Sequence, residues 1–327
     1  SASVKFDFAG GFTDAPNSIT QGIARLRTGL VRFDWDNTSL IAGQDALFLS
    51  PLSPTSLASL AVPALAYSGN LWSWAPQVRV EHRMHVTESS KLLLQGAVMD
   101  NLSGEVPNAA YATKATAIGD PGRGPIQEPT AGENTGQPAY AARIAWTGPL
   151  GDQTMTIGAG GYYSRQNWGF GRTIDGWAGT ADLAMPLGTV VEFDAEFYRG
   201  RALGGLAGGI GQSVLWRGPL LNATTNIYGL DSIGGWAQLK FKLTPKLELN
   251  GAFGLDNPYA YELRTLGGNP GYYNGILSKN MTPLANVMYQ PRSNVAMSIE
   301  YRYLKTYMLD SYANTANRVS LNLGYIF

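Results

Sequence analysis

Charged side chains at alternate positions are the residues of this sequence that could do chemistry. Arg25 and Arg27 lie two residues apart, Arg79 and Arg83 lie four apart, and three carboxylates alternate over residues 192–196. In an extended chain, residues two apart point to the same face, so each row is a line of charge on one side of a strand. Guanidinium groups bind carboxylates and phosphates well. The pattern therefore favours the recognition of charged solutes.

Enzyme signatures are weak in comparison. His82 and His85 are the only histidines, and because they lie three apart on a strand they point to opposite faces, which argues against a shared metal. His82 is expected to face lipid or a subunit contact. Ser298 and Glu300 share a face, but no histidine on a neighbouring strand completes a triad. The glycine-rich stretch 204–211 lacks the Lys-Ser/Thr pair of a phosphate loop. We predict no enzyme activity, no metal site and no cofactor.

The composition argues against further classes of protein. The 327 residues include 40 Gly and no Cys, only 15% are charged, and 24 basic residues balance 24 acidic ones. A neutral chain has no global field to attract nucleic acid, so we predict no nucleic-acid partner. The longest uncharged run, Ala46 to Val78, contains four prolines, which argues against a membrane-spanning helix. The chain begins Ser-Ala-Ser without a leader pattern, as expected of a mature chain.

The elements that position the charged rows are predicted from a period of two. At the end of the chain, Val319, Leu321, Leu323, Tyr325 and Phe327 alternate with small or polar residues, which indicates a strand with one apolar face. A break in phase in the second segment is explained by a bulge near Gly29. The sequence predicts fourteen strands, near 4–12, 22–35, 38–47, 76–85, 91–101, 138–147, 153–165, 176–185, 189–200, 234–244, 246–257, 279–290, 295–307 and 317–327.

The connections alternate between short and long. Six are turns of two to four residues, whereas 48–75, 102–137, 201–233 and 258–278 are long. This asymmetry is typical of outer-membrane β-barrels, and the sheet must close because an open edge leaves backbone groups unpaired in lipid. A soluble propeller or sandwich is the alternative, but no repeated blade motif is present. Aromatic girdles are predicted at strand ends, from Trp35, Trp146, Trp168, Trp177, Tyr289, Tyr325 and Phe327.

Two motifs resemble known proteins. The ending Gly324-Tyr325-Ile326-Phe327 looks like the C-terminal assembly signal of bacterial outer-membrane barrels. Ala24-Arg25-Leu26-Arg27, followed by an Ala-Gly-Gln segment and a Ser-Pro-Leu loop, resembles DcaP-type porins over about 60 residues. The resemblance implies a trimeric, sixteen-stranded channel for small anionic solutes in a Gram-negative outer membrane. Two strands expected upstream are absent, so either the barrel has fourteen strands or an N-terminal hairpin is missing.

The strand phase divides the lumen charges between two walls. Lipid-facing charge costs about 2–4 kcal/mol at the midplane, so the charged face lines the lumen. The arginine-rich wall contains one acid, Glu81, and is expected to stay unneutralised. On the other wall, Lys240 and Lys242 are expected to pair across strands with Asp194 and Glu192. The predicted pore-lining residues are Arg25, Arg27, Arg79, Glu81, Arg83, Arg143, Glu192, Asp194, Glu196, Lys240, Lys242, Glu300 and Arg302.

The long loops offer an alternative for the arginines. Loop carboxylates could pair with them and cancel any anion preference; the candidates are Glu105, Asp120, Glu128 and Glu133. Loop 102–137 is a possible constriction that folds inward. Loop 46–75 is apolar, so we expect it to pack against a neighbouring subunit or under another loop. The glycine-rich stretch 202–211 is expected to be mobile.

The function predicted from these features is passive diffusion. We interpret residues 1–327 as a single all-β transmembrane barrel, an outer-membrane porin for small hydrophilic, anionic solutes such as carboxylates. Its expected partners are those solutes, outer-membrane lipid and two further copies in a homotrimer. A barrel that acts as a scaffold or receptor, with long extracellular loops that bind a partner and with little conductance, is the alternative.

Overall fold

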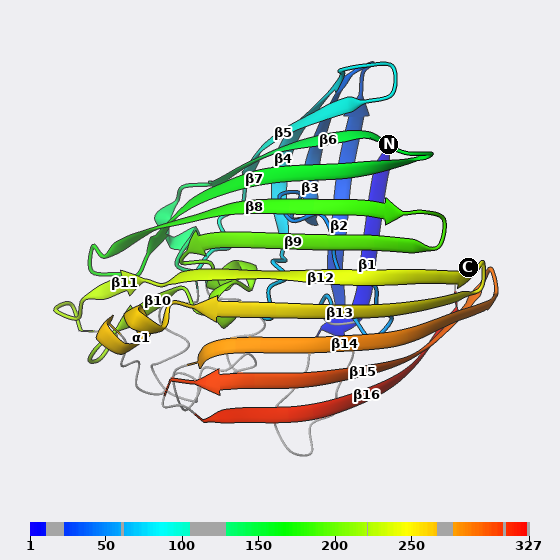
Figure 1. Ribbon diagram of the computed structural model, residues 1–327. Helices are drawn as coiled ribbons and strands as arrows, with labels where there is room; N and C mark the ends of the chain where they lie inside the picture. The colour runs from blue at the N-terminus through cyan, green and yellow to red at the C-terminus, as the bar shows by residue number, and fades with distance from the viewer. Residues whose placement is uncertain are drawn as a thin grey trace.

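One antiparallel sheet of fourteen strands forms the wall of the molecule (Figure 1). The computed structural model describes residues 1–10, 23–59, 62–104, 129–220, 222–266, 277–309 and 312–325. The strands of the wall are β1 (Ala2–Gly10), β2 (Ile23–Asp34), β3 (Thr38–Ala46), β4 (Trp74–His85), β5 (Lys91–Met99), β6 (Ala139–Leu150), β7 (Gln153–Asn167), β8 (Thr173–Leu187), β9 (Val191–Arg201), β12 (Asp231–Thr244), β13 (Leu247–Pro258), β14 (Leu277–Arg292), β15 (Val295–Met308) and β16 (Ala313–Tyr325).

Each strand pairs with its neighbours in chain order, and β9 pairs directly with β12. The sheet curls so that β1–β4 stand behind the wall formed by β7–β16 (Figure 1). All fourteen predicted strands are confirmed, with the short turns at one end of the wall and the long connections at the other. β1 and β16 are the two ends of the sheet order, and no ladder joins them among the described residues.

Small elements within the long connections were not predicted from the sequence. β10 (Val214–Trp216) and β11 (Ile227–Gly229) form a separate two-stranded sheet. The single α-helix of the described residues, α1 (Ala260–Leu266), follows β13. Three short 3-10 turns are η1 (Glu133–Thr135), η2 (Gly204–Leu206) and η3 (Gly209–Gly211). These pieces are too short to show a period.

No helix in the described ranges is long and apolar enough to cross a membrane.

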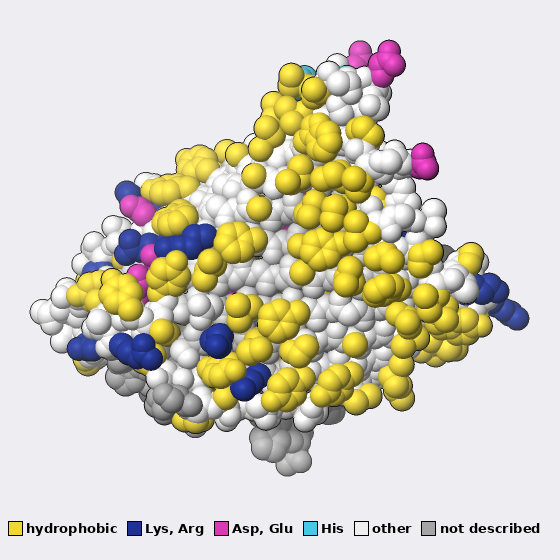
Figure 2. All heavy atoms as spheres, in the orientation of Figure 1, with side chains coloured by type: hydrophobic (Ala, Val, Ile, Leu, Met, Phe, Trp, Pro, Cys, Tyr) yellow, Lys and Arg dark blue, Asp and Glu magenta, His cyan; other side chains and the backbone are white. Residues whose placement is uncertain are grey.

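The alternation along the strands separates an apolar outer face from a polar inner one. On β4, Val78 and Val80 are exposed, whereas Gln77, Arg79 and Glu81 are buried inside the curled sheet. Hydrophobic side chains cover much of the outward face (Figure 2). Such a surface is a liability in water and is what a lipid-facing wall requires. The assignment of the apolar face to the outside is therefore confirmed.

The aromatic girdle is confirmed only in part. Trp35, Trp177 and Tyr289 are exposed on the outer face, as is Tyr325. Trp168 is an exception, because it is 1% exposed and packs in an inner cluster with Val214, Trp216 and Leu220. Its neighbours Gly169 and Gly171 sit in a turn rather than a strand, so the period-two argument does not apply to it. Phe327 lies outside the described residues.

The bulge expected near Gly29 is present two residues earlier. Phe6 pairs with Leu26 and Lys5 pairs with Thr28, so Arg27 is the extra residue on β2. After the bulge, Val31 and Phe33 point outward. One inserted residue therefore moves the apolar set of β2 back to the lipid face.

Candidate pore lining and constriction

Among the described residues, a loop lies inside the curled sheet and occupies part of the lumen. Residues 47–73, here called the inner loop, connect β3 to β4 and bond to inward side chains of the opposite wall. Ser50 donates its hydroxyl to Glu196 over 2.6 Å, and the Leu52 amide donates to the same carboxylate over 2.7 Å. Trp236 Nε1 also donates to Glu196, over 3.3 Å. Glu196 therefore holds one end of the inner loop.

A second set of bonds holds the middle of the inner loop. Ser56 donates to Glu300 over 2.5 Å, and the Thr55 amide donates to Gln238 Oε1 over 2.7 Å. Asn286 Nδ2 donates to the Thr55 carbonyl over 2.8 Å. Glu300 is 1% exposed, so it is an anchor and not a charge on an open pore surface.

The far end of the inner loop lies directly on the backbone of the wall. Gly69 has a φ of +97°, and a Cβ there would lie 2.1 Å from the Gly235 carbonyl oxygen. Only glycine tolerates both this conformation and this approach. Ser68 bonds to Thr282 over 2.9 Å beside it. Of the two packing alternatives predicted for loop 46–75, contact with another loop is confirmed, because Phe48 and Leu71 pack against Leu203 and Leu206. Its serines and backbone groups bind the polar inner face, which was not predicted. Contact with a neighbouring subunit stays a prediction.

A second inner segment, residues 202–213, packs against the inner loop inside the curled sheet. Leu203 and Leu206 are buried in a cluster with Phe48 and Leu71 of the inner loop. The Trp72 amide donates to the Leu206 carbonyl over 3.2 Å. The expected mobility of this glycine-rich stretch does not fit these contacts. Its glycines serve tight turns against the inner loop.

Two buried groups fix that segment to the wall. Tyr198 donates its hydroxyl to Asp256 over 2.8 Å. The Gly209 amide donates to Tyr198, and the Ile210 amide donates to the second oxygen of Asp256 over 3.2 Å. Neither Tyr198 nor Asp256 was predicted as a site residue. Both lie at inward positions of their strands, which is the signal that could have identified them.

Most of the predicted arginines are neutralised by carboxylates on the same strand or on a nearby one. Glu81 is the centre of an arginine cluster, with Arg32 at 3.3 Å, Arg79 at 3.0 Å and Arg83 at 3.0 Å. Arg32 also pairs with Asp34 over 2.7 Å. The expectation of an unneutralised wall is therefore wrong. Glu81 is shared by three guanidinium groups, and strand carboxylates that were not predicted to line the pore, such as Asp34, supply further negative charge.

The remaining described arginines of this wall are paired as well. Arg143 donates to both oxygens of Asp182, over 2.9 and 2.6 Å, and Arg79 also reaches Asp45 over 3.2 Å. These carboxylates lie on β3 and β8. Of the loop carboxylates expected to pair with the arginines, Glu133 instead accepts the Thr130 amide. Glu105, Asp120 and Glu128 lie outside the described residues, as does most of loop 102–137, whose role as a constriction stays a prediction.

The opposite wall pairs as the sequence predicts. Lys240 contacts Glu192 over 2.8 Å and Asp194 over 3.6 Å, and Lys242 contacts Glu192 over 2.5 Å. The register that aligns Lys240 with Glu192 brings these side chains together. Arg302 pairs with Glu300 over 2.6 Å on the same strand.

Arg27 differs from the other lumen arginines because it lines a cavity. Its guanidinium lies 4.8 Å from the centre of the Trp74 ring and 3.6 Å from Asp7. The cavity, of about 380 Å³, lies between β2 and the inner loop. Its polar lining consists of hydroxyls and ring N–H groups, from Ser50, Ser53, Ser56, Ser59, Trp72, Ser73 and Trp74.

Two donors of this cavity have no bond in the described structure. The buried Nε1 of Trp72 and the buried hydroxyl of Ser59 have no hydrogen-bond partner among the described residues. Buried polar groups are nearly always paired, by protein or by other molecules. Both atoms are buried in the wall of the cavity, so the 38% exposed side chain of Arg27 is the charged group that a solute in the cavity can reach. The backbone of Arg25 pairs with Asp7, but its side chain is not among those described.

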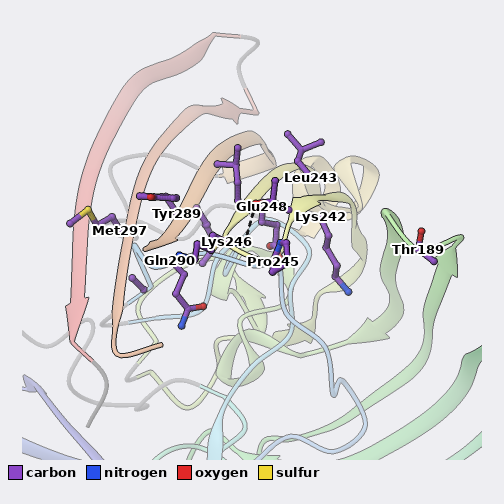
Figure 3. Close-up of a pocket in the computed structure, with 13 residues that line it drawn as sticks. Thr189, Lys242, Leu243, Pro245, Lys246, Glu248, Tyr289, Gln290 and Met297 are labelled. Atoms are coloured by element: carbon purple, nitrogen blue, oxygen red, sulfur yellow. Dashed lines mark hydrogen bonds between the residues drawn. The ribbon is translucent and has the colours of Figure 1, made fainter. Parts of the chain in front are cut away.

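A second cavity opens at the short-turn end of the wall. It has a volume of about 480 Å³ and lies at the turns that join β12 to β13 and β14 to β15. Figure 3 shows Lys242, Lys246 and Glu248 on one side of it and Gln290 on the other. Lys242 is 49% exposed, so this rim carries cations that water reaches.

Comparison with known proteins supports the fold. The structure is similar to the outer-membrane channel DcaP of Acinetobacter baumannii, with a TM-score of 0.68 and 16% sequence identity over 100% of this chain and 80% of that one. It is also similar to OprB of Pseudomonas putida, with a TM-score of 0.52 and 12% identity over 93% and 73% of the two chains. This chain has the fold of outer-membrane porins. The likeness to DcaP expected from the sequence is confirmed at the level of fold.

No protein-family model matches the sequence, and no curated protein sequence matches it either.

Proposed function

We propose that the chain is an outer-membrane porin through which small hydrophilic solutes diffuse passively. The observation that carries this proposal is the cavity between β2 and the inner loop. It is lined by Arg27 and several serines, and it is bounded by a loop that the opposite wall holds in place. A loop anchored inside a barrel narrows the channel. The similarity of fold to DcaP and OprB supports the same function.

We further propose that the channel prefers anions such as carboxylates. The arginine cluster does not support this, because Glu81, Asp45 and Asp182 balance it. The support comes from Arg27, which lines the cavity and lies 3.6 Å from its carboxylate, Asp7, farther than Arg79, Arg83 and Arg143 lie from theirs. A guanidinium replaces part of the hydration of a carboxylate and repels a cation.

Planar-bilayer recording under a salt gradient tests both parts. The wild-type protein should conduct in discrete steps and show a reversal potential on the anion side. Arg27→Gln should lower the anion-to-cation permeability ratio about fivefold, because one charge at 4 Å is worth about 1 kcal/mol in water. Arg165→Gln, on the outer face, is the matched control and should leave the ratio unchanged. An unchanged ratio in Arg27→Gln would contradict the anion preference, and a silent barrel would contradict the porin.

A scaffold or receptor is the second candidate. The second inner segment favours it, since Leu203, Leu206 and Ile210 are buried inside the sheet and reduce the space for a channel. A loop-rich end also supports a binding surface. Arg172, in the connection between β7 and β8, donates to the carbonyls of Trp168 and Leu220 and so ties this connection to the long one between β9 and β12. Burial lowers the pKa of Arg172. The bilayer recording separates this candidate from the porin, because a receptor of this kind conducts little. The homotrimer stays a prediction.

A further inference from the structure

The outward face of β14 and β15 has two lysines that converge on one aromatic ring. Lys279 Nζ lies 4.2 Å from the centre of the Tyr307 ring, and Lys305 Nζ lies 4.7 Å from the same centre. Lys279 is aligned with Tyr307 across the two strands. Two like charges that share one ring repel each other. The arrangement therefore has a free-energy cost that an anion would remove.

These lysines point outward and not into the lumen. On β14 they follow the phase of Val287 and Tyr289, and on β15 that of Ile299 and Tyr301, all of which are exposed on the outer face. The lysines lie at the long-loop ends of their strands, beyond the apolar residues. Figure 2 shows Lys and Arg side chains over the long-loop half of this face. This is the level at which a lipid-facing wall meets the headgroups of the outer leaflet.

The pair differs from the other outward cations in having no carboxylate partner in the described part of the chain. Arg165 pairs with Asp175 over 2.8 Å, and Arg199 pairs with Asp231 over 3.0 Å. No ion pair within the described ranges includes Lys279 or Lys305. Both side chains are half-buried, so their stems are held and their ammonium groups are positioned together.

We propose that Lys279, Lys305 and Tyr307 bind the phosphate of an outer-leaflet lipid headgroup. A phosphate between the two ammonium groups would neutralise them and accept hydrogen bonds from both. The acyl chains would lie on the apolar wall below, against Val287 and Ile299. The charge, the height on the wall and the adjoining apolar surface all match a phosphorylated lipid and not a free solute.

Native mass spectrometry of the intact barrel in detergent tests the proposal. The probes are bisphosphorylated lipid A, the same lipid after removal of its phosphates, and inorganic phosphate. The wild-type protein should bind the phosphorylated lipid well above the dephosphorylated one. Lys279→Gln with Lys305→Gln should weaken that binding about thirtyfold, since each lysine near a charged lipid surface is worth about 1 kcal/mol.

Two further variants keep the test decisive. Lys279→Arg with Lys305→Arg retains the charges and should restore binding, which excludes a folding defect as the cause. Lys91→Gln with Lys246→Gln removes two charges at the short-turn end and should leave binding unchanged. Equal binding of both lipids, or no loss in the Lys279→Gln and Lys305→Gln protein, would overturn the proposal. Displacement of the lipid by inorganic phosphate at similar concentration would also overturn it, as the site would then be one for free anions. Conductance is a separate readout, which these outward changes should not alter.

Discussion

The two charged walls of the lumen use the same alternation for different purposes. On the arginine-rich wall, Glu81 gathers three guanidinium groups, and the strands satisfy one another. On the opposite wall, Glu196 and Glu300 accept bonds from the inner loop. The charges of one wall form an ion-pair network among themselves, whereas two carboxylates of the other wall hold the inner loop. A charge on the lumen face is therefore not by itself a contact for solute.

Releasing the anchor should have the largest effect. In Glu196→Ala with Glu300→Ala, the Leu52 amide and the Ser50 and Ser56 hydroxyls lose their acceptors. Each unpaired buried group costs about 1–3 kcal/mol, so the inner loop should detach from the wall. Single-channel conductance should rise severalfold, with larger current noise.

The matched control is Glu192→Gln, which lies on the same wall but pairs with lysines of the adjacent strand. Its conductance should stay near the wild-type value. If Glu196→Ala with Glu300→Ala conducts like the wild type, the inner loop is held by its apolar contacts with the second inner segment, and the contrast between the walls fails.

Breaking the ion-pair network should have the next largest effect. Glu81→Gln leaves Arg32, Arg79 and Arg83 without their shared acid. Removing one partner of a buried ion pair typically costs about 3 kcal/mol, and the free energy of unfolding in urea should fall by that order. The wall gains one net positive charge, so the reversal potential should move toward anions. Asp34→Asn is the control, because Asp34 is half exposed and contacts only Arg32 among these arginines; it should change both quantities far less.

Strand positions were predictable because lipid and lumen impose a period of two over the whole wall. The cross-strand pairing of Lys240 with Glu192 and Asp194 followed from that period and a simple hairpin. The bulge was also predictable in kind, since Val31, Phe33 and Trp35 continue the apolar face in the opposite phase. Extending that phase by one residue would have placed Arg32 in the lumen.

The neutralisation of the arginines was not predictable with the same ease. Asp45 and Asp182 lie in segments with few charges, and their partners are 34 and 39 residues away in the sequence. Such pairs depend on which strands are adjacent and on their register. The position of the inner loop could not be predicted for the same reason. Its apolar residues suggested an interface, but the serines between them bind the lumen wall. The composition of the loop alone does not distinguish a loop at an interface from a loop bound to the lumen wall.

Removing a cation at the exposed rim should have the smallest effect, and it tests whether exposure distinguishes functional from structural charge. Lys242 is 49% exposed and shares Glu192 with Lys240. Lys242→Gln leaves Lys240 in place, so the free energy of unfolding should change by less than about 1 kcal/mol, as for other exposed pairs. The anion-to-cation permeability ratio should fall less than in Arg27→Gln, because Lys242 lies at the short-turn end and not in the cavity beside the inner loop. A larger shift in Lys242→Gln than in Arg27→Gln would place the selective step at the rim shown in Figure 3.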